Sequence, residues 1–161
     1  MIQTAAIAWS LFERAQVGIT RYTKDIAGDD WYARPQGVPT PMIWTLGHLA
    51  VYRDMALGAL TGQSNAPESW RQLFMTGSEP SADPATYPKP EELLAFIDAT
   101  QIKLKAFFET CTEEDLAGPL PFPHPFLKTK LQAATMLPMH EAHHSGSLCL
   151  VRRMLGKERI L

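Results

Sequence analysis

Hydrophobic side chains recur every three or four residues over four long stretches of the chain, the spacing that gathers them on one face of a helix. These stretches cover roughly residues 3–26, 40–60, 90–110 and 129–155. No stretch shows a convincing alternation of apolar and polar residues, which would be typical of a half-buried strand. The pattern therefore predicts an all-α fold built from four long helices.

Residues that favour helix ends mark several of these boundaries. Thr40 is a suitable N-cap, and Pro41 would then occupy the first helical position, where its missing N–H costs nothing. Pro90 opens the third predicted helix in the same way, and Gly156 follows the fourth as a stop.

A proline lies inside the fourth predicted helix. Pro138 either kinks one long helix or lies in the first turn of a shorter helix that begins near Thr135. Ala133 and Leu137 continue the apolar stripe upstream of the proline. We therefore expect one long helix with a kink.

The connection between the second and third predicted helices is long, from residue 61 to residue 89, and rich in Pro, Gly and Ser. Trp70, Leu73 and Phe74 could form a short packed helix within it. A connection of this length is usually a crossover or a lid over a functional site. The sequence thus predicts a four-helix bundle with one crossover, formed by a single domain over residues 1–161.

Charge and composition narrow the classes of function. The 161 residues carry a net charge of −2, and we find no basic cluster of the kind that binds nucleic acid. No apolar run approaches the length of about 18 residues that indicates a membrane span. The chain has two cysteines, Cys111 and Cys149, and no recognisable secretion signal. We therefore expect a cytoplasmic protein with no nucleic-acid partner and no membrane partner.

The most informative polar feature is the string His140-Glu141-Ala142-His143-His144. On a helix, His140 and His144 stand about 40° apart in the middle of the apolar stripe, whereas Glu141 and His143 point to its two flanks. A single histidine on an apolar stripe is usually a packed core residue. Two successive histidines need partners for their buried ring nitrogens, and one metal ion would serve both.

The same string fits H-E-x-x-H, the zinc-protease pattern in which the glutamate is the general base. That class needs a further ligand beyond the second histidine. Glu158 is too close to serve and lies past the expected end of the helix. The longer form of the pattern requires Gly and His where this chain has Ser147 and Leu150. These departures disfavour a protease.

A third candidate ligand lies on the second predicted helix. His48 belongs to the face of that helix that carries its large apolar and aromatic residues, whereas His124 lies between prolines in a link and is expected to be solvated. His48, His140 and His144 would form a three-histidine set that leaves coordination positions open for water or substrate.

Two motifs carry a family resemblance. Residues 44–50 (WTLGHLA) and 140–146 (HEAHHSG) together resemble the DinB/YfiT-like metalloenzymes, and residues 70–80 (WRQLFMTGSEP) resemble one branch of that family. The resemblance implies a four-helix bundle, often a homodimer, with three histidines that bind a divalent metal ion, commonly nickel or zinc. Those ligands correspond here to His48 and to the pair on the fourth helix.

One departure from the family pattern lies beside the last ligand. Many relatives have Gly-Gln there, where this chain has Gly146-Ser147. On the helix, Ser147 lies only about 20° from His140, so a shorter polar side chain there would alter the surroundings of the metal or the fit of a substrate.

The resemblance makes a metal-dependent thiol S-transferase the leading hypothesis, with a low-molecular-weight thiol as co-substrate and a small-molecule substrate. The metal would lower the pKa of the thiol and hold the thiolate against an electrophile. Glu141, Tyr52 and Ser147 are the candidates for catalytic proton transfer. Alternatively, Glu141 is a solvated residue at the rim, and Tyr52 only packs at the edge of the core.

Two other functions remain open. The same site would suit a metal-dependent hydrolase that activates water. The chain could also be a non-catalytic, stress-related metal-binding dimer, which would be recognised by a closed or saturated site.

Overall fold

The structure, a computed structural model, describes residues 1–160, and these residues form an all-α fold. Within this range the β pairing is limited to an isolated bridge between Pro119 and Thr129. The prediction of an all-α fold is therefore confirmed. The elements in chain order are α1 (Gln3–Thr23), η1 (Gly28–Trp31), α2 (Met42–Thr61), α3 (Glu68–Phe74), η2 (Pro84–Thr86), α4 (Pro90–Thr110), α5 (Glu113–Ala117) and α6 (Lys130–Met154).

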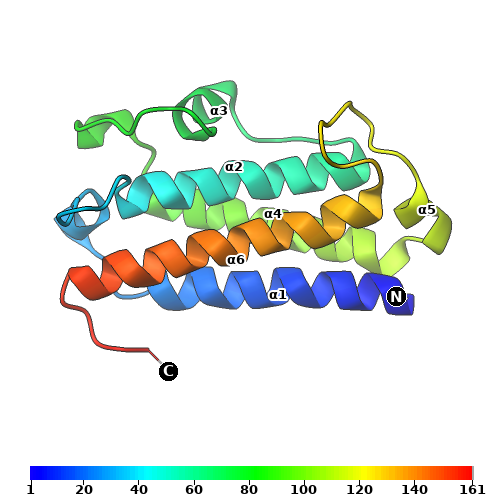
Figure 1. Cartoon of the computed structure of the whole chain (residues 1–161), viewed down its shortest axis with the longest axis horizontal. Coiled ribbons are helices and arrows are strands. Elements are labelled where there is room, and N and C mark those ends of the chain that lie inside the picture. The colour runs from blue at the N-terminus through cyan, green and yellow to red at the C-terminus, as the bar shows by residue number, and fades with distance from the viewer. Residues whose placement is uncertain (161) are drawn as a thin grey trace.

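The four long helices lie side by side, with α1 and α6 running in one direction and α2 and α4 in the other (Figure 1). α2 packs against α4 and α6, and α1 packs against α6 and α4. Because α2 and α4 are parallel neighbours, the chain has to return along the length of the helices between them. Residues 62–89, which include α3 and η2, make this return and are called the crossover below.

α2 is the central helix, and 17 of its 20 residues are buried. α4 and α6 cover two of its sides, and α3 packs against it as well. A polar side chain on such a helix needs partners inside the protein, because burial without a hydrogen bond is costly. Although α2 is apolar, neither it nor any other described helix has the apolar length that a membrane span requires.

The crossover is tied to α2 by the buried residue Asp54. Its carboxylate accepts hydrogen bonds from the backbone N–H groups of Asn65, at 2.8 Å, and Ala66, at 3.0 Å. It also pairs with the Arg71 guanidinium of α3 at 2.8 Å. A buried carboxylate with three donors is well compensated, so Asp54 fixes the start of the crossover to the central helix.

The start of α2 differs from the prediction. The helix begins at Met42, and Pro41 is in the N-cap position with an extended backbone. Thr40 is therefore not the cap, because Pro41 itself has a ψ of 162° and does not yet belong to the helix. Its hydroxyl lies 3.2 Å from the hydroxyl of Thr45 instead.

α6 runs through Pro138 as one helix from Lys130 to Met154. The alternative start near Thr135 is therefore wrong. A capping box explains the earlier start: the Thr129 side chain accepts from the backbone N–H of Gln132, and the Gln132 side chain accepts from the backbone N–H of Thr129.

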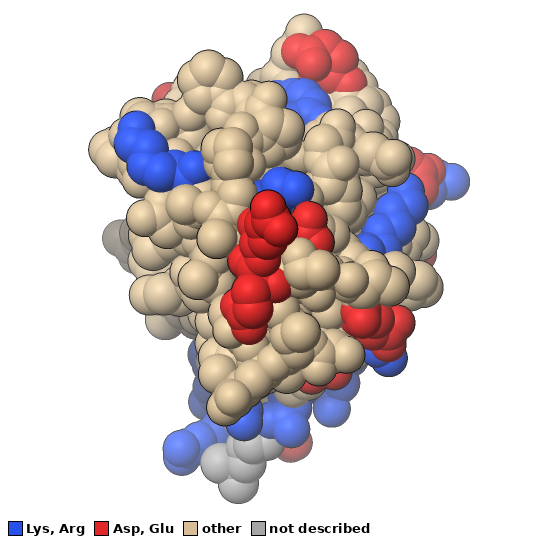
Figure 2. Space-filling view, turned by 90° about the vertical axis from the view of Figure 1, so that its right-hand side faces the viewer, with Lys and Arg blue, Asp and Glu red and all other residues tan. Residues whose placement is uncertain are grey.

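The end of the molecule near the N-terminus carries a group of acidic side chains (Figure 2). Glu113, Glu114 and Asp115 form the first turn of α5 there. Negative charge is favourable at this place because the N-terminal end of a helix carries partial positive charge.

Candidate metal centre

Three histidine rings meet between α2 and α6. His140 and His144 lie one turn apart on α6, and His48 faces them from α2. The Nε2 atom of His140 lies 3.2 Å from that of His48 and 3.1 Å from that of His144. The ligand atoms of all three lie within 4.8 Å of one another. The structure thus brings the predicted trio together, while its binding of a metal stays a prediction.

The spacing suits a common cation. Zinc bonds of about 2.0–2.1 Å in tetrahedral geometry place two nitrogen ligands about 3.3 Å apart. Both measured nitrogen separations around His140 lie close to that value. The donor set, three imidazoles, is also one that zinc and nickel accept.

A backbone carbonyl orients the His48 ring. The Nδ1 atom of His48 lies 2.7 Å from the carbonyl oxygen of Phe74, at the end of α3. Since a carbonyl only accepts, Nδ1 carries the proton and donates it, which leaves the Nε2 lone pair pointing at the other histidines. Phe74 can lie this close because Gly47 has no side chain: a Cβ there would come within 2.3 Å of the Phe74 ring.

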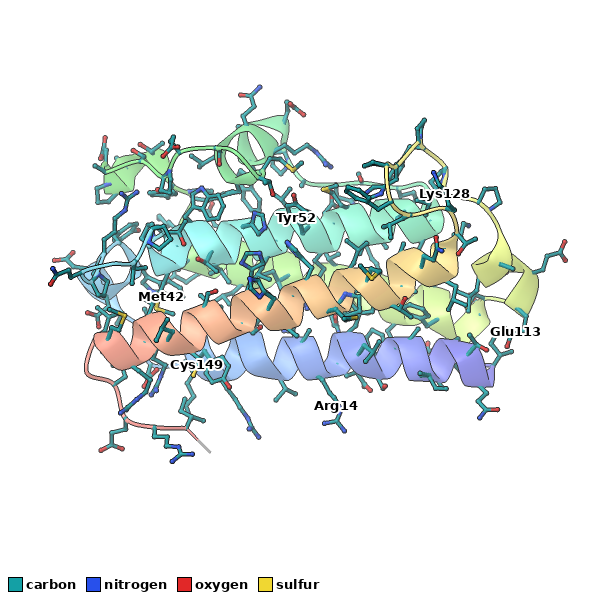
Figure 3. All side chains as sticks on the ribbon, in the orientation of Figure 1. Arg14, Met42, Tyr52, Glu113, Lys128 and Cys149 are labelled. Atoms are coloured by element: carbon teal, nitrogen blue, oxygen red, sulfur yellow. The ribbon has the colours of Figure 1, made fainter. Side chains whose placement is uncertain are left out.

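Aromatic rings pack around the histidines. The Trp44 ring stacks on His48 with centroids 5.0 Å apart and 18° between the planes. Tyr52 is labelled midway along α2 in Figure 3. Its ring centroid lies 4.3 Å from that of His48 and 4.4 Å from that of His140. Packing on both sides restricts the rotation of these imidazoles, which a preorganised metal site requires.

The crossover also holds these aromatic residues. The indole N–H of Trp44 donates to the carbonyl oxygen of Leu73 at 3.1 Å and to the Ser78 hydroxyl at 3.2 Å. The Tyr52 hydroxyl lies 2.7 Å from the Thr76 hydroxyl. Residues 73–78 therefore lie beside the histidine trio, as expected for a connection that covers a functional site.

Burial keeps the histidines neutral. Burial, and after it the neighbouring His48, lower the pKa of both His140 and His144 to about 4. Burial also lowers the pKa of His48, although its bond to Phe74 opposes this effect. Neutral imidazoles are the form that binds metal ions, so protons would compete little for these nitrogens at pH 7.

Glu141 is not the solvated rim residue that one alternative expected. Its side chain is 1% exposed, and its carboxylate accepts two hydrogen bonds from the fully buried Arg53 guanidinium. The helix angle alone placed Glu141 at the edge of α6, but α2 covers that edge and brings Arg53 opposite. Both carboxylate oxygens are engaged in this pair.

A chain of polar contacts leads from this buried pair out to the surface, where Asp98 is exposed. Arg53 also donates to the side-chain oxygen of Gln16 on α1, and the Gln16 amide donates to Asp98 on α4 at 2.7 Å. The four side chains thus come from all four long helices. Sequence reasoning did not identify Arg53, although a charged residue in the apolar run of α2 was a visible signal.

The other polar candidates lie around the trio. Ser147 is half-buried on α6, and the exposed His143 ring lies 5.1 Å from that of His144. His124 is half-buried, and its Nδ1 accepts from two backbone N–H groups of its own link, at 3.2 and 3.0 Å. It stabilises the link and lies outside the trio.

Comparison with known families decides the assignment. The family model of the DinB superfamily matches residues 11–148, a range that includes all three histidines. The chain belongs to the DinB superfamily. The resemblance of residues 44–50 and 140–146 to that family is therefore confirmed.

A solved structure shows the same DinB fold. It is described as the conserved protein of a locus from Enterococcus faecalis, and it matches with a TM-score of 0.73 at 15% identity. The match covers 98% of this DinB chain and 100% of the other. No curated protein matches the chain.

The lowered histidine pKa values predict a pH dependence of stability. Between about pH 6.5 and pH 4 the unfolded chain binds more protons than the folded, metal-free protein, since an ordinary histidine has a pKa near 6.5. The free energy of unfolding should therefore fall as the pH is lowered through this window and should be unaffected by these groups above it. Urea denaturation at several pH values would measure this.

A His140→Ala, His144→Ala double variant should lose most of that dependence. NMR titration provides the direct check. Values above 6 for these two rings in the folded, metal-free protein would contradict the prediction.

Gly47 should be required for tight metal binding. Gly47→Ala places a methyl group against the Phe74 ring, so the Phe74 carbonyl moves away from His48. We expect metal affinity to fall about 10- to 100-fold, the usual effect of losing the partner that orients a ligand. Competition with a chromophoric chelator would measure it.

Gly146→Ala is the matched control, because Gly146 also lies in a helix and a Cβ there meets nothing within 4 Å. Equal affinities of the two variants would show that the contact of Phe74 with Gly47 does not position the ligand.

Proposed function

We propose that the three histidines bind a divalent metal ion and that the chain is a metal-dependent enzyme, in the first place a thiol S-transferase. The observation that carries the proposal is the convergence of three Nε2 atoms at a place where two of the rings, His140 and His144, are only half-buried. Three protein ligands with access to solvent leave room for a reactant, as in catalytic zinc sites. Nickel and zinc are the cations that we expect, with a low-molecular-weight thiol as co-substrate.

A divalent cation held here would lower the pKa of a thiol bound beside it. In the transfer, the sulfur loses its proton and forms a bond to the carbon of an electrophile, whose leaving group departs with the bonding electron pair. We assign the outward transfer of that proton to Tyr52 and Thr76, and the 2.7 Å between their hydroxyls supports this assignment. Glu141 is a poor candidate for this role because Arg53 engages its carboxylate.

The half-buried position of His140 and His144 also favours an enzyme over a closed, non-catalytic metal site. Hydrolysis by activated water would use the same residues, so an experiment has to separate it from thiol transfer. The packing of α1, α2, α4 and α6 along one another supports classing the fold as a four-helix bundle with one crossover.

The ligand assignment predicts the behaviour of histidine variants. Purified protein loaded with zinc or nickel should hold about one ion per chain, and His48→Ala should lose it because two imidazoles bind weakly. His124→Ala should retain the ion, since His124 bonds its own link. Elemental analysis after desalting measures both. Full occupancy in His48→Ala would overturn the trio.

Activity is then tested with the loaded protein. Transfer of small thiols to electrophiles would support the S-transferase, ester cleavage without thiol would support the hydrolase, and the absence of both would favour the non-catalytic alternative.

A second copy of this chain is the partner that we propose for the outer face of α6. Between Lys130 and Arg153 the charged residues of this helix are Glu141 and Arg152, and both are buried. A solvent face without charge over so many turns is unusual for a helix at the surface. The face carries both projecting side chains, such as the exposed Met139, and open positions, such as Gly146.

A groove of about 370 Å³ between α1 and α6 continues this surface. Ser145 lines it, and its buried hydroxyl lacks a hydrogen-bond partner in the described part of the chain. Antiparallel pairing of two α6 helices about a two-fold axis near Ala142 would place Met139 of one copy against Gly146 of the partner subunit. Because the same helix carries a projecting Met139 and an open position at Gly146, the surface of one copy can fit the same surface of a second copy.

The dimer proposal predicts a change of mass. Gly146→Glu should give monomers, because it puts a charge against Met139 of the partner subunit, while the open space at Gly146 leaves the fold intact. Ile102→Glu, at a 71% exposed position on α4, should leave the dimer unchanged. Sedimentation equilibrium distinguishes the two masses, and a monomeric parent protein would refute the proposal.

A further inference from the structure

An apolar strip extends from the histidine trio along the seam between α2 and α6. On α2, the stripe that holds His48 continues through Tyr52 to Met55. On α6, Met136 and Leu137 lie one turn before His140. Since these helices are antiparallel, the two stripes continue together away from the trio.

The far end of the strip is closed by the link between α5 and α6. Met55 and Leu137 line one recess together with Leu120, Phe122 and His124 of that link. A helix rises about 1.5 Å per residue, so Met55 lies about 10 Å along α2 from His48. The apolar strip, defined as Met55, Met136, Leu137, Leu120 and Phe122, is therefore within reach of a small molecule held at the trio.

The strip is open to solvent although it is apolar. Met136 is 51% exposed and Phe122 is 38% exposed, while Met55 and Leu137 are half-buried. None of its side chains is charged. Methionine side chains adapt their shape to what they contact, which suits a surface that receives apolar groups of different form.

We infer that the reactant held at the metal centre carries an apolar chain or ring, and that this part lies along the apolar strip. The inference rests on the proposed function, because it needs a reactant at the trio. The strip is continuous with the histidine trio, and this indicates that its occupant is part of the same reactant. It begins beside Tyr52 and His140, whose ring centroids are 4.4 Å apart. A charged substituent at the same position would find no oppositely charged side chain among the five residues of the strip.

The test uses cobalt-loaded protein and a series of alkanethiols from ethanethiol to pentanethiol. Cobalt(II) makes binding visible by absorption, so the readout is independent of catalysis. Full burial of a methylene group corresponds to about a fourfold gain in affinity, and a half-open strip should give about twofold. Affinity should therefore rise about eightfold over the three added methylenes.

Variants locate the effect. Met55→Gln and Met136→Gln should reduce the gain per methylene towards none, with ethanethiol binding unchanged. Ile102→Gln, at an exposed apolar position on α4, should keep the full gain. Circular dichroism confirms that each variant is folded.

The outcomes separate the two proposals. If the thiols bind with equal affinity at every chain length, or if the two strip variants keep the gain, the apolar strip is refuted while the metal centre stands. If no thiol changes the cobalt spectrum, the proposed thiol chemistry fails and the inference fails with it.

Discussion

The buried pair of Arg53 and Glu141 is the constraint on which the arrangement of the helices depends. A guanidinium and a carboxylate removed from water are stable only when each compensates the other, and breaking such a pair by removing one partner typically costs about 3–5 kcal/mol. Here the pair joins α2 to α6, and the contacts of Arg53 with Gln16 and of Gln16 with Asp98 extend it to α1 and α4. Sliding α2 past α6 would therefore leave an unpaired charge in the core, because this pair is fully buried.

This constraint also determines the geometry of the histidine trio. Glu141 directly follows His140, and Arg53 lies on the same helix as His48. The ion pair thus fixes the register of the two helices that supply the ligands, close to the ligands themselves. The role of Glu141 is therefore structural: its pair with Arg53 holds His140 and His144 opposite His48. In the H-E-x-x-H pattern of a protease it would instead act on a water molecule, so the same letters serve a different purpose here.

The sequence was sufficient for those parts that depend on one helix at a time. Periodicity located the long helices, and the angles around α6 selected His140 and His144 over His143. It was insufficient where a residue's surroundings come from a distant segment. Glu141 looked exposed because its partner Arg53 is 88 residues away, and the role of Phe74 was invisible because a backbone carbonyl has no signature in the sequence. Gly47, a missing side chain on a crowded helix, was the one local sign of that contact.

The bond between His48 and the Phe74 carbonyl would make the crossover a participant in any cation binding at the histidine trio. Docking of the crossover orients the imidazole, and a cation on Nε2 strengthens the Nδ1–H donor. Thermodynamic linkage requires these two effects to be equal in free energy. An occupied centre would therefore suppress local opening of the residues around Phe74, while a vacant one would release them more often. The segment that returns the chain from α2 to α4 would in this way respond to the supply of metal.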